Sequence, residues 1–406
     1  MAMVSASSRL SRLRPSGVRE LFELARRYPD AVNLTLGEPD AATPENVREA
    51  ARRAMEGGLT HYTPNAGLPE LRRAIAERYA REYGAGFGED QVLVTQGGSQ
   101  ALLEAFAATM DEGDSVLVPT PAFVGYAGAA SILGIRAIEV PTRAEDGFAP
   151  TVESLRAAAD GRTRAVVVNS PNNPTGAVYG RRVLEEVVSF AEERDLWIIS
   201  DEVYERFVFD GEFVSMASFD AEVLGRTIIV NSFSKTYAMT GWRIGYMVAP
   251  RAIVEEAIKF QMYDAVCPSS ISQAAALEAL RGPQDFTRRY VEEVRRRMEY
   301  AHSRLSSMEG VSVVRPRGAF YIFPRIDAGM GSADLARALL EEERVAVVPG
   351  IAFGAAGEGH VRISLAASMD SIARGLDGIE RFLARRRGAG RRRPLSNNDI
   401  YRHNAA

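Results

Sequence analysis

Lys235 is the residue whose position in this 406-residue chain most directly indicates covalent chemistry. It follows the apolar run at residues 227–231, which is typical of a strand buried in a parallel sheet. Ligands of open α/β sheets bind beside the carboxyl ends of such strands. Burial there would disfavour the charged ammonium, lower the lysine pKa and leave a neutral amine able to form a Schiff base with a carbonyl group.

Other polar residues follow predicted strands in the same way. Gly98 and Ser99 come after the run at residues 92–95, and a glycine-rich turn that opens a helix can bind a phosphate through its backbone N–H groups. Asp201 follows the run at residues 196–200. Taken singly, an acid or a glycine pair after a strand is more often a helix cap or a turn, so these residues have to be judged together.

The elements that must position these residues follow a β-α-β pattern from about residue 90 onward. Short β-branched runs alternate with helical patterns, and several runs are continuously apolar, as strands covered on both faces by helices are. The predicted strands are residues 92–95, 115–118, 165–169, 196–200 and 227–231, and the predicted helices include residues 100–110 and 183–191. The sequence therefore predicts an α/β fold with a mostly parallel, doubly covered sheet.

The pattern changes after about residue 280, and because 406 residues exceed what one core usually holds, we expect two domains. The later elements are a long amphipathic helix at 286–305, strands near 311–314 and 319–323, and helices near 332–342 and 370–381. The expected division is an N-terminal arm that forms part of the small domain at 1–44, a large domain at 45–280, a small α+β domain at 281–384, and a basic, disordered tail at 385–406. A helical apolar stripe at residues 18–25 indicates that folded structure begins near residue 16.

Composition excludes several classes of protein. The 49 basic and 53 acidic residues are mixed along most of the chain, so the net charge of −4 calls for neither a nucleic-acid nor a membrane partner. No run of 18 apolar residues is present. The single cysteine, Cys267, rules out an internal disulfide framework and fits an inert apolar role in a reducing compartment. The first 19 residues faintly resemble a transit peptide, but we expect a cytoplasmic protein.

Seven short motifs, taken in their order and spacing, resemble the fold-type I aminotransferases, the aspartate aminotransferase-like family that depends on pyridoxal 5′-phosphate. The motifs are residues 36–40, 62–67, 172–176, 201–204, 232–235 with Arg243, 318–321 and 360–364. The likeness extends over residues 16–384. It implies the fold of that family, with a mostly parallel seven-stranded sheet covered by helices in the large domain and a smaller α+β domain.

The resemblance implies that Lys235 carries the cofactor as a Schiff base. Removing a proton from the Cα atom of an amino acid near pH 7 needs an electron sink, which a protonated pyridine ring conjugated to an imine provides. Asp201 would keep the ring nitrogen protonated, because a neighbouring anion raises the pKa of that nitrogen. The family likeness also implies that Tyr204 and Asn173 hydrogen-bond the phenolic oxygen of the cofactor, and that Phe123 stacks on its ring.

The phosphate of the cofactor would lie against the start of the predicted helix after residue 95. Gly98 and Ser99 would donate backbone N–H groups, while Ser232 would add a hydroxyl and Arg243 a charge-assisted bond. The resemblance further implies that Tyr62 reaches the phosphate bound to a neighbouring subunit. We therefore expect a homodimer with its sites at the interface.

The substrate would be held by its α-carboxylate. Arg362 is the candidate, because a planar guanidinium forms two parallel hydrogen bonds with a carboxylate and so orients the Cα–H bond. Gly37 would contact the same carboxylate through its backbone, and Asn173 would lie close enough to touch the substrate. No metal ion is expected in this site.

These residues predict a ping-pong transamination from an L-amino acid to a 2-oxo acid, for which the resemblance suggests 2-oxoglutarate. Aspartate is the favoured donor, although no second arginine for a dicarboxylate is evident. Aromatic and alanine-type donors share the same motifs, and a carbon–sulfur lyase on the same scaffold would use the same Lys235 and Asp201. A non-catalytic cofactor-sensing regulator is the least favoured alternative, since it would need a DNA-binding domain ahead of residue 16.

Overall fold

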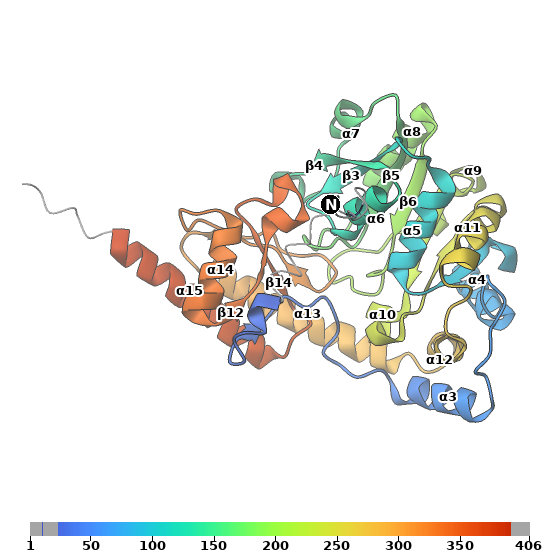
Figure 1. The fold of residues 1–406 in the computed structure, drawn as a ribbon. Helices are drawn as coiled ribbons and strands as arrows, with labels where there is room; N and C mark the ends of the chain where they lie inside the picture. The colour runs from blue at the N-terminus through green and yellow to red at the C-terminus, as the bar shows by residue number, and fades with distance from the viewer. Residues whose placement is uncertain (1–9, 11–22, 391–406) are drawn as a thin grey trace, which may run out of the picture.

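The structure is a computed structural model that describes residue 10 and residues 23–390. An open sheet flanked by helices, which we call the sheet region, lies beside a smaller C-terminal region of helices and short strands (Figure 1). Of the helix expected at residues 18–25, residues 23–25 are helical and the others lie outside the described residues. No helix in the described part of the chain is long and apolar enough to cross a membrane.

Seven strands form the central sheet in the order β2-β8-β7-β6-β5-β3-β4. They are β2 Val92–Thr95, β3 Ser115–Thr120, β4 Arg136–Pro141, β5 Thr163–Asn169, β6 Trp197–Asp201, β7 Thr227–Ser232 and β8 Gly245–Val248. The five strands from β7 to β4 pair in parallel, and β8 lies antiparallel to both of its neighbours. The predicted fold class is confirmed, but the sequence does not predict β4 and β8.

Helices cover both faces of this sheet, as the continuously apolar strands require. Successive side chains of a strand point to opposite faces, and in β5 Ala165 and Val167 join one buried cluster while Val166 and Val168 join another. The first cluster is closed by α5 Gly98–Thr109, α6 Gly125–Ile132 and α11 Arg251–Asp264, and the second by α4 Pro69–Tyr83, α7 Val152–Ala158, α8 Arg181–Arg194 and α12 Ser270–Arg281. Helix α3 Glu45–Glu56 packs on α12.

The remaining elements of the sheet region are short. Two one-turn helices flank β7, α9 Ala221–Leu224 and α10 Phe233–Thr236. Single turns of 3-10 helix occur at Glu89–Gln91, Ala144–Asp146, Met216–Ser218 and Thr240–Trp242. Helix α10 begins at the residue after β7, so the fold turns sharply at the carboxyl end of that strand.

The C-terminal region has a second buried cluster, formed mainly by its own helices and strands and joined by Tyr204, Phe207 and Phe209 from the segment after β6. Its helices are α13 Asp285–Ser306, α14 Ser332–Glu343 and α15 Met369–Gly390, and its 3-10 turns are Gly350–Phe353 and Ala355–Gly357. Its strands are β9 Val311–Ser312, β10 Tyr321–Ile322, β11 Arg325–Ile326, β12 Val345–Ala346, β13 Val348–Pro349 and β14 Val361–Ser364. The N-terminal strand β1 Val32–Asn33 pairs in parallel with β12, so this N-terminal segment packs with the C-terminal region (Figure 1).

The basic segment expected to be disordered from residue 385 is in part helical. Helix α15 continues to Gly390, and Arg385 and Arg386 form ion pairs with Glu342 and Glu343 of α14. The arginines of this segment give no apolar periodicity from which a helix could be predicted. The sequence also does not show that acidic residues of α14 lie opposite them. Residues 391–406 lie outside the described residues, and the domain boundaries expected from the sequence stay predictions.

Candidate active site

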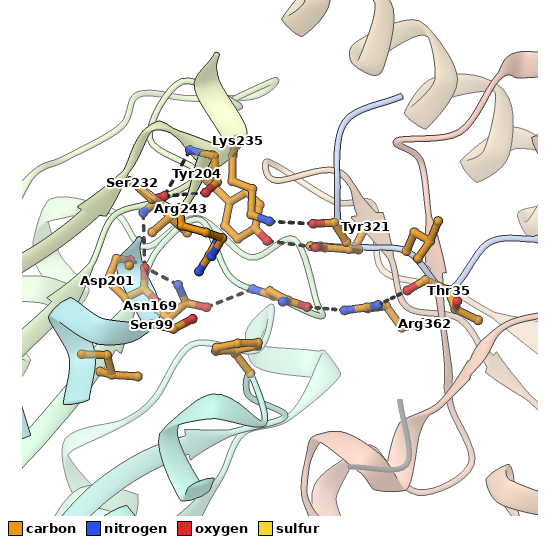
Figure 2. Close-up of a pocket in the computed structure, with 18 residues that line it drawn as sticks. Thr35, Ser99, Asn169, Asp201, Tyr204, Ser232, Lys235, Arg243, Tyr321 and Arg362 are labelled. Atoms are coloured by element: carbon orange, nitrogen blue, oxygen red, sulfur yellow. Dashed lines mark hydrogen bonds between the residues drawn. The ribbon is translucent and has the colours of Figure 1, made fainter. Parts of the chain in front are cut away.

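A cavity of about 450 Å³ opens at the carboxyl ends of the parallel strands, between the sheet region and the C-terminal region. Figure 2 shows Asp201, Ser232 and Lys235 on the side of the sheet, with Tyr321 and Arg362 facing them from the other side. The predicted site residues that line the cavity are Gly37, Gly98, Ser99, Phe123, Asn173, Asp201, Tyr204, Ser232, Lys235, Arg243 and Arg362. Tyr62 is the predicted residue that does not line it.

Strand register explains why residues distant in sequence meet here. Asp201, the last residue of β6, pairs with Asn169 at the end of β5. Ser232, the last residue of β7, pairs with Gly245 of β8, and Gly245 also pairs with Thr95 at the end of β2. Parallel strands that end at one edge of a sheet bring the residues after them together.

Lys235 lies in the one-turn helix α10, whose first backbone groups are capped by Ser232. The Oγ atom of Ser232 accepts a hydrogen bond from the N–H of Ser234 at 3.1 Å. The Nζ atom of Lys235 donates to the carbonyl oxygen of Gly37 at 2.6 Å. Burial, aided by the positive charge of Arg362, lowers the pKa of Lys235 to about 8. A substantial fraction of the amine is therefore neutral near pH 8.

Asp201 is a buried acid with defined partners. Its Oδ2 atom accepts a hydrogen bond from the hydroxyl of Tyr126 at 2.5 Å, and its Oδ1 atom accepts one from the N–H of Val203 at 3.3 Å. Burial raises the pKa of Asp201, while these two hydrogen bonds and the charge of Lys235 oppose the rise. The carboxylate is thus fixed in position and would be further stabilised by a cationic group in the cavity.

The turn between β2 and α5 brings backbone N–H groups close to Arg243. Gly97 has φ +83°, and a Cβ atom there would lie 2.7 Å from Nη2 of Arg243, so this position requires glycine. The next residues, Gly98 and Ser99, begin α5 and line the cavity. Arg243 donates to the carbonyl oxygen of Thr240 at 2.9 Å and forms no ion pair within the described residues. This corner suits a dianionic phosphate.

Arg362 is a buried cation in need of an anion. Its Nη1 atom donates to Oδ1 of Asn173 at 3.1 Å, and its Nη2 atom donates to the carbonyl oxygen of Thr35 at 2.6 Å. Its Nε atom is buried without a hydrogen-bond partner, and the guanidinium lies 4.4 Å from the ring centroid of Tyr321 and 5.0 Å from that of Phe353. Burial lowers the pKa of Arg362. An incoming carboxylate would supply the missing negative charge.

Tyr321 lies against both Tyr204 and Gly37. The hydroxyls of Tyr204 and Tyr321 lie 2.9 Å apart. A Cβ atom at Gly37 would lie 2.6 Å from the hydroxyl oxygen of Tyr321, so the backbone reaches the cavity here because no side chain intervenes. Tyr62, in contrast, is 84% exposed in the single chain.

Several residues of the site escaped the sequence reasoning. Tyr126 holds Asp201, Thr35 holds Arg362, and Tyr321 belongs to a matching motif but received no role. Asn169 accepts a hydrogen bond from the backbone N–H of Asn173 at 3.0 Å. As a polar residue that ends an apolar run it could have been found, whereas nothing in the sequence connects Tyr126 to Asp201.

The charges of the cavity define the ligand it suits. Lys235, Arg243 and Arg362 bring three basic groups, and Asp201 is the acidic group among the lining residues. A ligand with two separate anionic groups would match the arginines, and a carbonyl group beside Lys235 would meet a partly neutral amine.

Comparison with known proteins gives concordant matches. A family model described as aminotransferase class I and II matches residues 29–379. An aspartate aminotransferase of Pyrococcus abyssi is 46% identical over 387 residues, which cover 94% of this chain and 98% of the relative. Aromatic-amino-acid aminotransferase 2 of Thermococcus litoralis is 44% identical over the same shares of both chains. A solved structure of Thermus thermophilus aspartate aminotransferase with maleate is 41% identical, covers 94% of this chain and 100% of its own, and has a TM-score of 0.89.

Proposed function

Because the chain belongs to the class I and II aminotransferase family, we propose that this aminotransferase binds pyridoxal 5′-phosphate and transfers the α-amino group of an L-amino acid to a 2-oxo acid. The observation that carries the proposal is that Lys235 and Asp201 line one cavity together with the unpaired Arg362. An amine, an acid and an anion-binding guanidinium are the groups this chemistry requires of the protein.

The residues fit the cofactor group by group. Gly98, Ser99 and Arg243 offer N–H donors for its phosphate, and Asp201 is a buried acid able to hold a proton on its ring nitrogen. The amine of Lys235, with a pKa of about 8, can bind its aldehyde. When bound, pyridoxal 5′-phosphate supplies an electron sink that makes the Cα proton of an amino acid removable.

The protein's own side chains then bind, orient and move a proton. Arg362 would hold the α-carboxylate through a charge-assisted pair and so fix which bond of the Cα atom faces Lys235. The Nζ atom of Lys235 would take the proton from Cα, because a neutral amine of moderately lowered pKa is an effective base near pH 8. The contact between the hydroxyls of Tyr204 and Tyr321 would keep these two side chains in fixed positions in the cavity.

Aspartate is the first candidate donor, supported by a relative that carries that name at 46% identity. A second candidate is an aromatic amino acid, which one observation favours. Leu36, Leu102 and Val203 add apolar surface to the cavity, and its lining within the described residues holds no basic group besides Lys235, Arg243 and Arg362. A dicarboxylate would therefore need a further cation from a partner subunit.

The proposal includes a homodimer in which Tyr62 acts on the partner's site. Large apolar side chains are exposed at Tyr62 and, at the end of α11 or just beyond it, at Met262, Tyr263 and Val266. The side chain of Asn65 donates to the carbonyl oxygen of Val266 at 2.7 Å, so these two segments lie side by side. Exposed apolar side chains on two adjoining segments are typical of an interface.

The experiment on Lys235 has a built-in control, because the chain contains two lysines, Lys235 and Lys259. Lys259 is 64% exposed and pairs with Glu256 on α11. Protein reconstituted with pyridoxal 5′-phosphate should be modified at Lys235 after borohydride treatment, as read by peptide mass mapping. Lys235→Ala should abolish turnover and the visible absorbance of the bound cofactor, and Lys259→Ala should leave both unchanged. Full activity of Lys235→Ala, or trapping on Lys259, would contradict the proposal.

The donor is tested by the half-reaction of the holoenzyme with L-aspartate, L-glutamate, L-tyrosine, L-phenylalanine and L-alanine. Loss of the visible absorbance with aspartate and glutamate would identify a dicarboxylate enzyme, and faster loss with tyrosine and phenylalanine the second candidate. Release of pyruvate from cystathionine without an oxo-acid acceptor would instead indicate a lyase.

The cross-subunit role of Tyr62 is tested by complementation. Lys235→Ala and Tyr62→Ala chains, each impaired alone, are unfolded together and refolded as a mixture. If Tyr62 serves the partner's site, mixed dimers contain one site with both residues intact, and activity returns. No recovery in dimers shown to be mixed would place Tyr62 outside the partner's site.

A further inference from the structure

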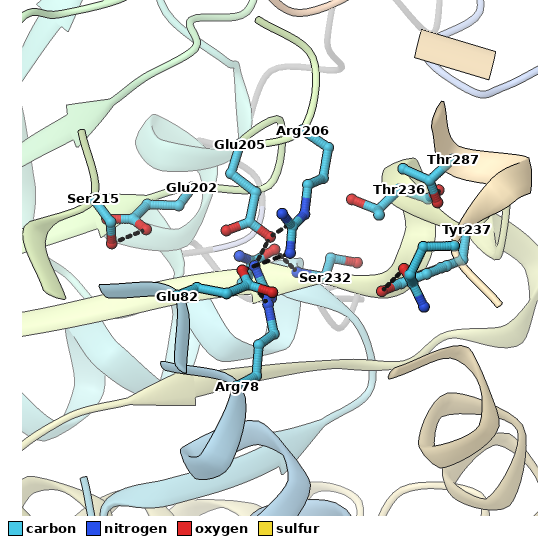
Figure 3. Close-up of polar contacts among 12 residues, drawn as sticks. Arg78, Glu82, Glu202, Glu205, Arg206, Ser215, Ser232, Thr236, Tyr237 and Thr287 are labelled. Atoms are coloured by element: carbon cyan, nitrogen blue, oxygen red, sulfur yellow. Dashed lines mark hydrogen bonds and ion pairs between the residues drawn. The ribbon is translucent and has the colours of Figure 1, made fainter. Parts of the chain in front are cut away.

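A group of charged side chains lies beneath the active site and does not line the cavity. Arg78 and Glu82 of α4 and Glu205 and Arg206 of the segment after β6 form this group, which we call the buried charge cluster. Figure 3 shows the guanidinium of Arg78 among the side chains of Glu82, Glu205 and Arg206. The side chains of Arg78 and Glu205 are 6% and 2% exposed. They form the most deeply buried pair of the cluster.

Arg78 uses each of its three nitrogen atoms. Its Nη2 atom pairs with Oε1 of Glu205, its Nε atom donates to Glu82 at 3.1 Å, and its Nη1 atom donates to the hydroxyl of Tyr246 at 2.7 Å. These partners lie on three different elements, α4, the segment after β6, and β8. Arg78 therefore ties parts of the chain together that are far apart in sequence.

The first of these ties leads to Asp201 and Tyr204. Glu205 directly follows Tyr204, and its backbone N–H donates to the carbonyl oxygen of Glu202 at 3.0 Å. The backbone N–H of Glu202 in turn donates to Val230 of β7 at 2.9 Å. The short turn that carries both cavity residues is thus fixed at its far end by the carboxylate of Glu205.

The second tie leads to Lys235. Tyr246 pairs with Asn231 of β7, one residue before Ser232. The ring of Tyr246 lies 5.7 Å from that of Phe233, the first residue of α10, and Phe233 stacks on Tyr237 at 5.9 Å. Lys235 lies between these two stacked residues in sequence, so a shift of Tyr246 would tilt the helix that carries it.

A buried ion pair rarely adds stability over an apolar pair of similar volume, because desolvation offsets the attraction. We propose that Arg78 is a positioning residue, which joins the turn bearing Asp201 and Tyr204 to the helix bearing Lys235 through Glu205 and Tyr246. The proposal rests on the proposed function of these residues as cofactor ligands. Arg78 sets the spacing between the carboxylate of Asp201 and the amine of Lys235 on the sheet side of the cavity, without lining the cavity itself.

This role predicts a selective kinetic effect. Arg362 is held by Thr35 and Asn173, and neither forms a hydrogen bond with a residue of the cluster in the described part of the chain, so carboxylate binding and KM should change little. The rate kcat should fall, because misplacing reacting groups by about 1 Å can slow a reaction by roughly 100-fold. The pH titration of the visible absorbance of the bound cofactor should also shift, since Asp201 and Tyr204 set the charge around it.

Two tyrosines that hydrogen-bond to the cluster provide a matched pair of variants. Tyr246→Phe removes the hydroxyl that links Arg78 to β8, while Tyr83→Phe removes a hydroxyl that donates to Glu205 at 3.0 Å but does not lead to α10. Each change deletes one hydrogen bond to a charged partner and alters no charge, so the two variants should lose similar amounts of stability. On the holoenzyme, Tyr246→Phe should lower kcat on the order of 10-fold and shift the absorbance titration. Tyr83→Phe should match the wild type in both measurements.

Arg78→Lys and Arg78→Met complete the series. Lysine keeps the positive charge beside Glu205 but cannot bind all three partners of Arg78. Arg78→Lys should therefore lower kcat and shift the absorbance titration, as Tyr246→Phe does, and leave KM unchanged. Arg78→Met removes the nearest cation from Glu205, which keeps Arg206 at 3.9 Å and the hydroxyl of Tyr83 at 3.0 Å, and the variant can fail to fold. In that case the two tyrosine variants decide the matter. Equal kcat and equal titrations for Tyr246→Phe, Tyr83→Phe and wild type would overturn the proposal and show a purely structural cluster. If the wild type itself binds no pyridoxal 5′-phosphate, the proposed function fails instead.

Discussion

Replacing Glu104 with Gln should make the protein more stable, and the gain should grow as the pH rises. Glu104 lies in α5 with 0% of its surface exposed, and neither carboxyl oxygen has a hydrogen-bond partner. Burial, with a smaller contribution from the charge of Asp264, raises its pKa from 4.5 to about 9. The folded protein therefore keeps a proton on Glu104 that the unfolded chain has lost.

The sign and size of the effect follow from proton linkage. Between pH 4.5 and about 9 the folded state binds more protons than the unfolded state, so the free energy of unfolding falls as pH rises. Each pH unit in this window corresponds to about 1.4 kcal/mol, which gives roughly 3 kcal/mol at pH 7 relative to pH 4.5. Gln has nearly the same shape and does not ionise, so the variant lacks this loss.

The measurement is urea unfolding of holoenzyme at fixed protein concentration, repeated from pH 5 to pH 9 with reversibility checked by refolding. The free energy of Glu104→Gln minus that of the wild type should be near zero at pH 5 and should rise steadily toward pH 9. Glu77→Gln, a change on the exposed face of α4, serves as the matched control and should show a flat difference. A flat difference for Glu104→Gln as well would refute the reasoning.

Three further outcomes are expected. Arg362→Lys should raise KM for the amino donor by roughly 10- to 100-fold in steady-state assays, because one charge-assisted hydrogen bond contributes about 1.5–3 kcal/mol; an unchanged KM would remove Arg362 from the substrate site. Gly97→Ala should weaken retention of pyridoxal 5′-phosphate on gel filtration, because φ +83° disfavours Ala and the Cβ atom would lie 2.7 Å from Nη2 of Arg243. The control variant Gly86→Ala has open space around its Cβ atom and should retain the cofactor normally. The rate at which cofactor-free protein takes up pyridoxal 5′-phosphate should rise with pH and level off above about 8, the pKa to which burial lowers Lys235, because the neutral amine is the nucleophile; stopped-flow absorbance that is flat from pH 6 to 9 would contradict this.

Much of the fold was predictable from local patterns. The apolar runs at β5, β6 and β7 and the helical spacing of α8 and α13 identify themselves within windows of 5 to 20 residues. Strands β4 and β8 could not be recognised from local patterns, because β4 is half exposed and β8 has four residues, one of them glycine. Their place in the sheet depends on pairing with strands distant in sequence, which no local window records.

The grouping of the site residues in one cavity was also predictable, because polar residues that end buried strands share one edge of the sheet. Lys235, Asp201 and Asn173 could be proposed from that rule and from the motif order. Their environment could not. Three features of that environment depend on which segments pack against each other in the folded chain. They are the hydrogen bond from Tyr126 to Asp201, the Nε atom of Arg362 without a hydrogen-bond partner, and the burial of Glu104.

The sequence by itself determined which residue types stand at the strand ends, since that follows from side-chain chemistry and short-range periodicity. Only the tertiary structure decided their electrostatic state. Whether Lys235 titrates near pH 8, or Arg78 ties α4 to β8, depends on desolvation and on contacts between segments more than 100 residues apart. Those quantities are set by packing, and packing is a property of the whole folded chain.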